Sequence, residues 1–113
     1  MSKIYLACPY SSKSYSERIY RANVANRIAG ILISQGHIVF SPISHGHAIA
    51  STCDNIQTDH LAWRELNHKM IRWSEEVHII TLPGYDTSEG ITDERDYASE
   101  LTKPIILIHP DDV

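Results

Sequence analysis

Three carboxylates stand close together in the sequence, just after a glycine that ends a polar loop. They are Asp93, Glu94 and Asp96, and they fall near the start of a predicted helix. Acidic residues are favoured in the first turn of a helix because of its dipole, so the cluster has an ordinary structural explanation. In a cleft, however, a carboxylate can attack an electrophilic carbon, and nearby carboxylates tune its pKa. Glu94 is therefore a candidate nucleophile.

Two histidines form a second group, His45-Gly46-His47. This spacing can place two imidazoles on one metal ion, but Cys53, Asp54 and Asp59, the candidates for a third ligand, complete no known metal-binding pattern. We therefore expect no bound metal, and we interpret His45 and His47 as part of a polar loop that helps to close over a ligand. The other five histidines are dispersed through predicted strands and helices: His37, His60, His68, His78 and His109.

Two further loops carry polar groups. Residues 8–12 (CPYSS) offer hydroxyls, a stacking ring and backbone N–H groups that can hold an anion at a helix start. Residues 82–90 (LPGYDTSEG) have two glycines that allow a close approach of the backbone, and Asp86, Thr87 and Ser88 can hydrogen-bond to a polar ligand. Each loop also has a plain structural interpretation. Residues 8–12 can be a proline turn with a capping serine, and residues 82–90 can be a solvated turn with Ser88 as N-cap.

The elements that must position these loops follow from the hydrophobic pattern. Short apolar runs predict strands over residues 4–7, 37–40, 77–82 and 104–108. Helical spacing predicts helices over residues 15–35, 59–74 and 91–101, the first opened by the capping box Ser14-x-x-Glu17 and stopped at Gly36. Residues 41–58 have no clear period and are predicted to form a long loop. In the second helix Trp63, Leu66, Met70 and Trp73 share a face, which we interpret as core or subunit contact.

Alternating strands and helices predict a three-layer α/β domain with a parallel sheet of about four to five strands. The continuous runs at residues 79–80 and 105–108 suit parallel strands that are covered on both faces. In such sheets ligands bind beyond the carboxyl ends of the strands, near the point where the strand order reverses. That edge receives residues 8–12, 41–47 and 82–90, so the candidate chemistry gathers there.

Composition limits the remaining possibilities. The chain has 113 residues, and we expect a single domain over residues 1–113. A formal charge of −4 disfavours nonspecific nucleic-acid binding. No apolar run approaches the roughly 20 residues of a membrane span, and the first residues lack a signal-peptide pattern. Cys8 and Cys53 form no CxxC motif. We therefore expect a reduced, cytoplasmic protein without a nucleic-acid or membrane partner.

Four segments carry a resemblance to a known family. Residues 4–11 (IYLACPYS) resemble the opening strand and turn of nucleoside 2-deoxyribosyltransferase-like proteins, where a Tyr-Leu-Ala-Gly-Pro motif is typical. Residues 90–98 (GITDERDYA) resemble their second motif, in which a glutamate precedes an alanine by four residues. Residues 82–90 and 41–47 (SPISHGH) are similar to the small, largely uncharacterised branch of that superfamily. The motifs follow in the same order over nearly the whole chain.

The resemblance implies a flavodoxin-like (Rossmann-like) fold, no cofactor, and a nucleoside or nucleotide as the small-molecule partner. It implies that Glu94 attacks C1′ of the sugar, that the base leaves, and that water or a second base resolves the covalent glycosyl-enzyme. It also implies a homo-oligomer. Tyr97, one helical turn beyond Glu94, is expected to orient it. The full set of expected substrate-binding residues, which includes the two histidines above, is Tyr5, Pro9, Tyr10, Ser11, His45, His47, Gly84, Tyr85, Ser88, Gly90 and Tyr97.

The sequence departs from the family pattern at three positions. Cys8 replaces a glycine, and Tyr85 stands where tryptophan is usual. On the second helix, where characterised relatives use an acidic residue to assist the departing base, this chain has Asn67. Asp59 is the expected substitute, because it opens that helix at the site end. If it does not reach the base, the proton must come from elsewhere, such as a histidine of residues 45–47, or the protein binds a nucleotide without turning it over.

The expected function is therefore that of a nucleoside or nucleotide N-glycosidase or 2-deoxyribosyltransferase, with Glu94 and Asp59 as catalytic residues. The alternative is a non-catalytic nucleotide-binding or sensor module that uses the same pocket. Glu94 favours the enzyme and Asn67 favours the binding module, and the fold alone does not decide between them.

Overall fold

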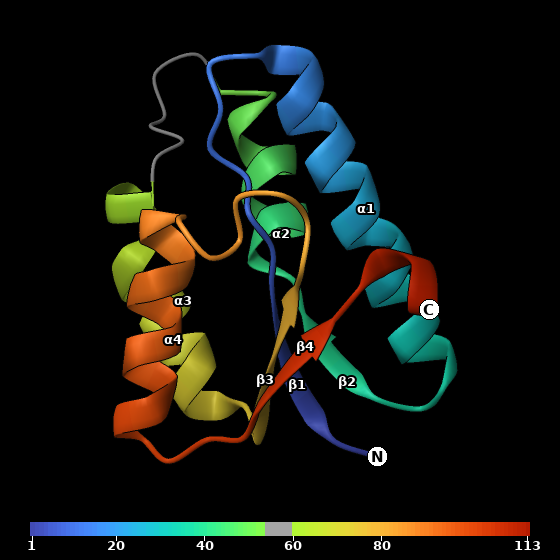
Figure 1. Cartoon of the computed structure of the whole chain (residues 1–113), viewed down its shortest axis with the longest axis vertical. Helices are drawn as coiled ribbons and strands as arrows, with labels where there is room; N and C mark the ends of the chain where they lie inside the picture. The colour runs from blue at the N-terminus through green and yellow to red at the C-terminus, as the bar shows by residue number, and fades with distance from the viewer. Residues whose placement is uncertain (54–59) are drawn as a thin grey trace.

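The computed structural model describes residues 1–53 and 60–113 (Figure 1). Its four strands are β1 (Lys3–Ala7), β2 (Ile38–Phe40), β3 (Glu76–Ile80) and β4 (Ile105–Ile108). Its α-helices are α1 (Tyr15–Ser34), α2 (Pro42–Ala50), α3 (His60–Trp73) and α4 (Glu89–Glu100), and a short 3₁₀ helix covers Pro110–Asp112. No helix within the described residues is long and apolar enough to cross a membrane.

The strands form one parallel sheet in the order β2-β1-β3-β4. From β1 the chain first moves outward to β2 and later returns to place β3 on the other side of β1. The strand order therefore reverses between β1 and β3, and the crevice beyond their carboxyl ends is the expected ligand site. These observations confirm the predicted α/β class and the predicted number of strands.

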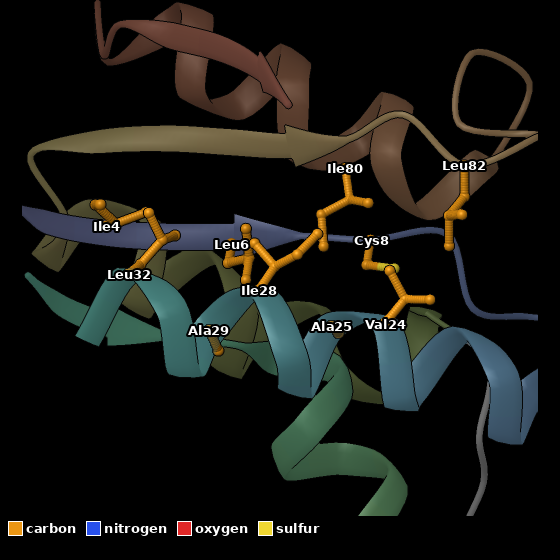
Figure 2. Packing of buried hydrophobic residues seen from close by; sticks show 10 residues of the cluster. All are labelled: Ile4, Leu6, Cys8, Val24, Ala25, Ile28, Ala29, Leu32, Ile80 and Leu82. Carbon is orange, nitrogen blue, oxygen red and sulfur yellow. The ribbon is translucent and has the colours of Figure 1, made fainter. Parts of the chain in front are cut away.

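Helices cover the sheet on both faces (Figure 1). Ile4 and Leu6 of β1 pack against α1 in one buried cluster, whose ten members Figure 2 shows. Tyr5 and Ala7 point the other way, into a second cluster formed with residues of α3 and α4. This alternation follows from the two-residue period of a strand. It sends Tyr5 toward α4, which carries Glu94.

The first crossover begins and ends where the sequence predicts. Ser14 is the N-cap of α1 and accepts a hydrogen bond from the backbone N–H of Glu17. The backbone at Gly36 has φ +95°, a conformation that glycine adopts without steric cost and that stops the helix.

The predicted loop over residues 41–58 is wrong for its first part, because α2 occupies Pro42–Ala50. Ser41 is the N-cap and accepts a hydrogen bond from the backbone N–H of Ser44. Pro42 stands at the start of the helix, where its fixed φ suits a helix and its missing N–H costs no hydrogen bond. Thr52 and Cys53 follow the helix, and residues 54–58 lie outside the described residues.

Coverage on both faces is confirmed for β3 and is wrong for β4. Ile79 and Ile80 are fully buried, whereas Ile106 and Leu107 are 41% and 47% exposed. The reason is position: β3 lies between two strands and β4 lies at the edge of the sheet, where one side has no neighbouring strand among the described residues.

Candidate active site

A pocket lies beyond the carboxyl ends of the strands, where the sheet topology places a ligand. Four segments contribute to its wall: the loop after β1, helix α2, helix α3, and helix α4 with its N-cap. Its lining combines apolar side chains with a few polar groups, which is typical of small-molecule sites. The lining residues are Cys8, Tyr10, Ser11, Pro42, Ile43, Gly46, His47, Ala50, Trp63, Asn67, Ser88, Gly90, Ile91 and Glu94.

Glu94 supplies the one carboxylate among these lining residues. Its side chain is buried, at 8% exposure, although it is ionisable. The Tyr5 hydroxyl donates a hydrogen bond to Oε2 of Glu94. Burial raises the pKa of Glu94 to about 7 against the opposing effect of this hydrogen bond, and the charge of Asp93 adds to the increase. A buried carboxyl with a raised pKa in a cleft is typical of a functional group.

Tyr5 reaches Glu94 from the central strand β1 and is itself fully buried. Burial and the neighbouring Glu94 raise the pKa of Tyr5 well above its usual value. The hydroxyl therefore keeps its proton near neutral pH and acts as a donor to the carboxylate. Tyr5 is not among the residues that line the pocket, so it contacts the candidate nucleophile from the buried side.

Asp93 points away from Glu94, because consecutive helical residues do not share a face. Nε of Arg64 donates to one Asp93 oxygen at 2.9 Å, and Nε2 of His68 lies 2.7 Å from the other. Burial raises the pKa of Asp93, but the hydrogen bonds from His68 and Arg64 outweigh that effect, so the pKa lies below its usual value. The charge of Asp93 thus persists and acts on Glu94, while Asp96 is exposed.

His47 and Tyr10 meet on the wall of the pocket. Tyr10 Oη lies 2.7 Å from Nδ1 of His47, and the two rings are arranged edge to face. Tyr10 comes from the loop after β1, and His47 from α2. This hydrogen bond therefore joins two of the predicted strand-end segments at the pocket.

The interpretation of His45 and His47 as neighbours on one loop needs correction, because both lie on α2. Residues two apart on a helix do not face each other. His47 lines the pocket, whereas His45 is exposed and contacts the rings of Phe40 and Trp63. Among the described residues no group of three or more His, Cys, Asp and Glu side chains could hold a metal ion.

The other predicted binding residues divide into two sets. Ser11, Ser88 and Gly90 line the pocket, and Ser88 is the N-cap of α4, accepting from the backbone N–H of Ile91. Pro9, Gly84 and Tyr85 do not line it. Gly84 forms a turn with φ +95° beside Arg21, and Tyr85 packs against the buried cluster that contains Tyr5.

Tyr97, predicted to orient Glu94, makes its contacts with residues of α3. Tyr97 stacks on His68, with ring centroids 3.9 Å apart, and its hydroxyl accepts a hydrogen bond from Arg72 at 2.8 Å. Its side chain therefore contacts α3, and it also packs against the buried cluster that contains Tyr5. Tyr5 makes the hydrogen bond to Glu94 instead.

Trp63 is the main pocket residue that the sequence interpretation placed elsewhere. It was expected in the core or at a subunit contact, but the half-buried ring lines the pocket together with Asn67. The two residues are four apart and so share a face of α3. That spacing could have identified Trp63 once Asn67 was placed at the site. Asp59, the predicted second catalytic residue, lies outside the described residues.

Three comparisons bear on this fold. The family model described as "Domain of unknown function (DUF1937)" matches residues 2–109, and no curated protein matches the chain. The structure is similar to a 2-deoxyribosyltransferase from Bacillus psychrosaccharolyticus, with TM-score 0.66 and 24% identity over 96% of this chain and 72% of that one. It is also similar to a 2-desoxiribosyltransferase from Leishmania mexicana, with TM-score 0.61 and 20% identity over 96% of this chain and 65% of that one. The predicted flavodoxin-like fold is confirmed, as is the resemblance to a small branch of these proteins at the level of fold.

Proposed function

The chain belongs to the DUF1937 family, and from its pocket we propose that it cleaves the N-glycosidic bond of a nucleoside or nucleoside 5′-monophosphate. One observation carries this proposal: a buried carboxyl, Glu94, lines the pocket and accepts a hydrogen bond from the Tyr5 hydroxyl. The similarity in fold to two 2-deoxyribosyltransferases supports the same class of reaction.

In the proposed reaction Glu94 is the nucleophile. An oxygen of its carboxylate forms a bond to C1′ of the sugar while the bond from C1′ to the base nitrogen breaks, and the electron pair of that bond stays on the base. Water, or the nitrogen of a second base, then attacks C1′, and the carboxylate leaves. Two displacements at one carbon retain its configuration. The reaction is a hydrolysis in the first case and a transfer in the second.

Tyr5 has a positioning role in this proposal. Because its hydroxyl holds Oε2, the other carboxylate oxygen is the one we assign to attack. The hydrogen bond also stabilises the ionised form of Glu94, which is the form that can act as a nucleophile. Without this donor, burial would keep a larger fraction of Glu94 protonated at neutral pH.

The remaining lining residues suit the parts of a nucleoside. The ring of Trp63 with Ile43 and Ile91 provides an apolar surface for a base. Ser88 and Gly90 lie at the start of α4, where backbone N–H groups and the helix dipole favour a sugar hydroxyl or a phosphate.

Incubation with a substrate panel tests the proposal. The panel contains 2′-deoxynucleosides, ribonucleosides and their 5′-monophosphates, and the released base is measured by chromatography. We expect release from at least one 2′-deoxy substrate by the wild type and none by Glu94→Gln, which keeps the shape of the side chain and removes the nucleophile. Trapping with a 2′-deoxy-2′-fluoro analogue should add the mass of the sugar to Glu94.

Two results would contradict the proposal. Base release that persists in Glu94→Gln would exclude Glu94 as nucleophile. Saturable binding of one nucleotide by calorimetry, without release of base from any member of the panel, would identify a binding module instead. Glu100→Gln, an exposed position near the end of the same helix, controls for the substitution itself.

A further inference from the structure

The departing base needs a proton, and the described wall of the pocket offers no second carboxyl to supply it. Glu94 is the one Asp or Glu among the described lining residues, and it is occupied as the nucleophile. The α3 side of the pocket presents Asn67, whose amide can hydrogen-bond to a base but does not transfer a proton. A different side chain must therefore act as the acid if the proposed function is correct.

The other titratable side chains on the wall are Cys8, Tyr10 and His47. Burial raises the pKa of Cys8 to about 12, despite the nearby Arg21. Burial also raises the pKa of Tyr10, against the lowering effect of the Arg18 guanidinium beside it. The thiol and the phenol thus hold their protons more tightly than usual and are poor acids. An imidazole, in contrast, is the side chain that most often donates protons in catalysis.

The position of His47 is fixed through one nitrogen. Nδ1 lies 2.7 Å from the Tyr10 hydroxyl, and the rings meet at 75° with centroids 5.6 Å apart. When the imidazole carries both protons, Nδ1 donates to Tyr10 and Nε2 bears the second proton. This arrangement matches the common pattern in which a partner holds one nitrogen of a histidine and the other nitrogen acts on the substrate.

We propose that His47 is the general acid that protonates the departing base through Nε2, and that Tyr10 is its positioning residue. This inference rests on the proposed function of Glu94. As the C1′ bond to the base breaks, the electron pair on the base takes the Nε2 proton, and His47 becomes a neutral imidazole still held by Tyr10. In the second step the neutral imidazole takes the proton from the attacking water, or from the incoming base, and is restored.

The test compares bases that need a proton to leave with bases that do not. One pair is 2′-deoxyguanosine and 7-methyl-2′-deoxyguanosine, whose methylated base already carries a positive charge. The other is 2′-deoxyuridine and 5-nitro-2′-deoxyuridine, whose nitro group stabilises the departing anion. All four are offered as nucleosides and as 5′-monophosphates. General acid catalysis contributes about 10²- to 10⁴-fold, so His47→Gln should lower kcat/KM by that factor for the unmodified member of a pair and by less than about 10-fold for the activated member.

Several outcomes distinguish this inference from the proposed function. Equal losses on both members of a pair in His47→Gln, or no loss on either, would overturn the role of His47 while base release that requires Glu94 still stands. No release by the wild type from any substrate would overturn both. Asp59 was predicted for the same task, so Asp59→Asn is measured in parallel; a selective loss in that variant and none in His47→Gln would assign the acid to Asp59.

Two further variants control for a general defect of the helix and test the role of Tyr10. Ala48→Gln places the same amide side chain at the exposed neighbouring position on α2 and should leave kcat/KM unchanged. Tyr10→Phe keeps the ring and removes the hydroxyl that holds Nδ1. It should lower kcat for the unmodified substrates by about 10-fold, leave KM within 3-fold, and spare the activated substrates. A rise in KM with kcat unchanged would mean that Tyr10 only contacts the ligand.

Discussion

The Tyr5 hydroxyl donates a hydrogen bond to Oε2 of Glu94, and through this contact the central strand β1 holds a carboxyl on helix α4. Both side chains are buried. Burial favours the neutral form of Glu94 and the hydrogen bond favours the charged form, so the pair balances two opposing effects on a single pKa. Three predictions concern this pKa: they remove the Tyr5 hydroxyl, the Glu94 carboxyl, or the neighbouring charge of Asp93.

Removing the hydroxyl with Tyr5→Phe should raise the pKa of Glu94 above about 7, because the hydrogen bond that lowers this pKa is lost. The pH below which base release declines should therefore move upward. The buried carboxyl also loses its donor, which should cost about 1–3 kcal/mol in the free energy of unfolding. A pH–rate profile and urea unfolding measure the two effects. Tyr20→Phe, at an exposed position on α1, should change neither; an unshifted profile in Tyr5→Phe would contradict the assignment.

Replacing Glu94 with Gln should make the protein more stable relative to the wild type as the pH rises. The pKa of Glu94 is about 7 in the folded chain against 4.5 for an ordinary glutamate, so the folded state binds more protons between these limits. The free energy of unfolding of the wild type therefore falls as pH rises from about 4.5 to 7, by at most roughly 3 kcal/mol. Glu94→Gln removes this contribution.

Thermal unfolding of the wild type and of Glu94→Gln across pH 4 to 8 measures the effect. The difference in Tm should shift in favour of the variant through this range and stay constant above it. Glu100→Gln should follow the wild type throughout. A difference that does not change with pH would mean that Glu94 titrates normally in the folded chain.

Asp93→Asn should act on Glu94 in the opposite direction to Tyr5→Phe. The charge of Asp93 raises the pKa of Glu94, so its removal should move the acidic decline of base release to lower pH. The variant also breaks the contacts of Asp93 with Arg64 and His68. Because these groups are partly exposed, we expect a loss of about 1–2 kcal/mol in the free energy of unfolding.

The pKa of Asp93 is lowered in the folded chain, so its stabilising contribution is present above the unfolded pKa and is lost as pH falls through the folded one. The destabilisation by Asp93→Asn should accordingly be full at pH 7 and disappear in acid. Urea unfolding at several pH values checks this, with the exposed Asp96→Asn as control. An upward shift of the acidic decline would exclude the proposed action of Asp93 on Glu94.

Much of the fold could be predicted because it depends on local patterns. Apolar runs identified the four strands, and Ser14 and Gly36 marked the ends of α1. Helix α2 was missed because its apolar spacing is weak, although Ser41 and Pro42 together are a start signal. The exposure of β4 could not be predicted, because strand order decides which strand lies at an edge.

The site was predicted less completely, because its contacts join residues that are distant in the sequence. The position of Glu94 follows from the topology rule, but its partner Tyr5 comes from a strand 89 residues away. Tyr97 was chosen for its closeness on the helix, yet it contacts His68 and Arg72 of α3. Which face of α4 meets which helix is a property of packing that one sequence does not reveal. The single domain, the homo-oligomer and the cytoplasmic location stay predictions.

The two tryptophans offer a direct test of the pocket. Trp63 lines it, whereas Trp73 is not among the lining residues and has the Lys3 ammonium 5.9 Å from its ring centroid. A nucleobase bound in the pocket should therefore quench the fluorescence of Trp63 and leave that of Trp73 unchanged. Titrating the Glu94→Gln protein with 2′-deoxynucleoside 5′-monophosphates avoids turnover during the measurement.

With Trp73→Phe added, the quenching should persist, and with Trp63→Phe added, it should disappear. Stacking of a base on an aromatic ring contributes about 1–3 kcal/mol, so Trp63→Ala should weaken binding by roughly 5- to 160-fold. Trp73→Ala should leave the dissociation constant within 2-fold. If quenching instead vanishes with Trp73→Phe, or if both alanine variants weaken binding equally, the base does not lie against Trp63, and the pocket that contains Glu94 is not where the nucleotide binds.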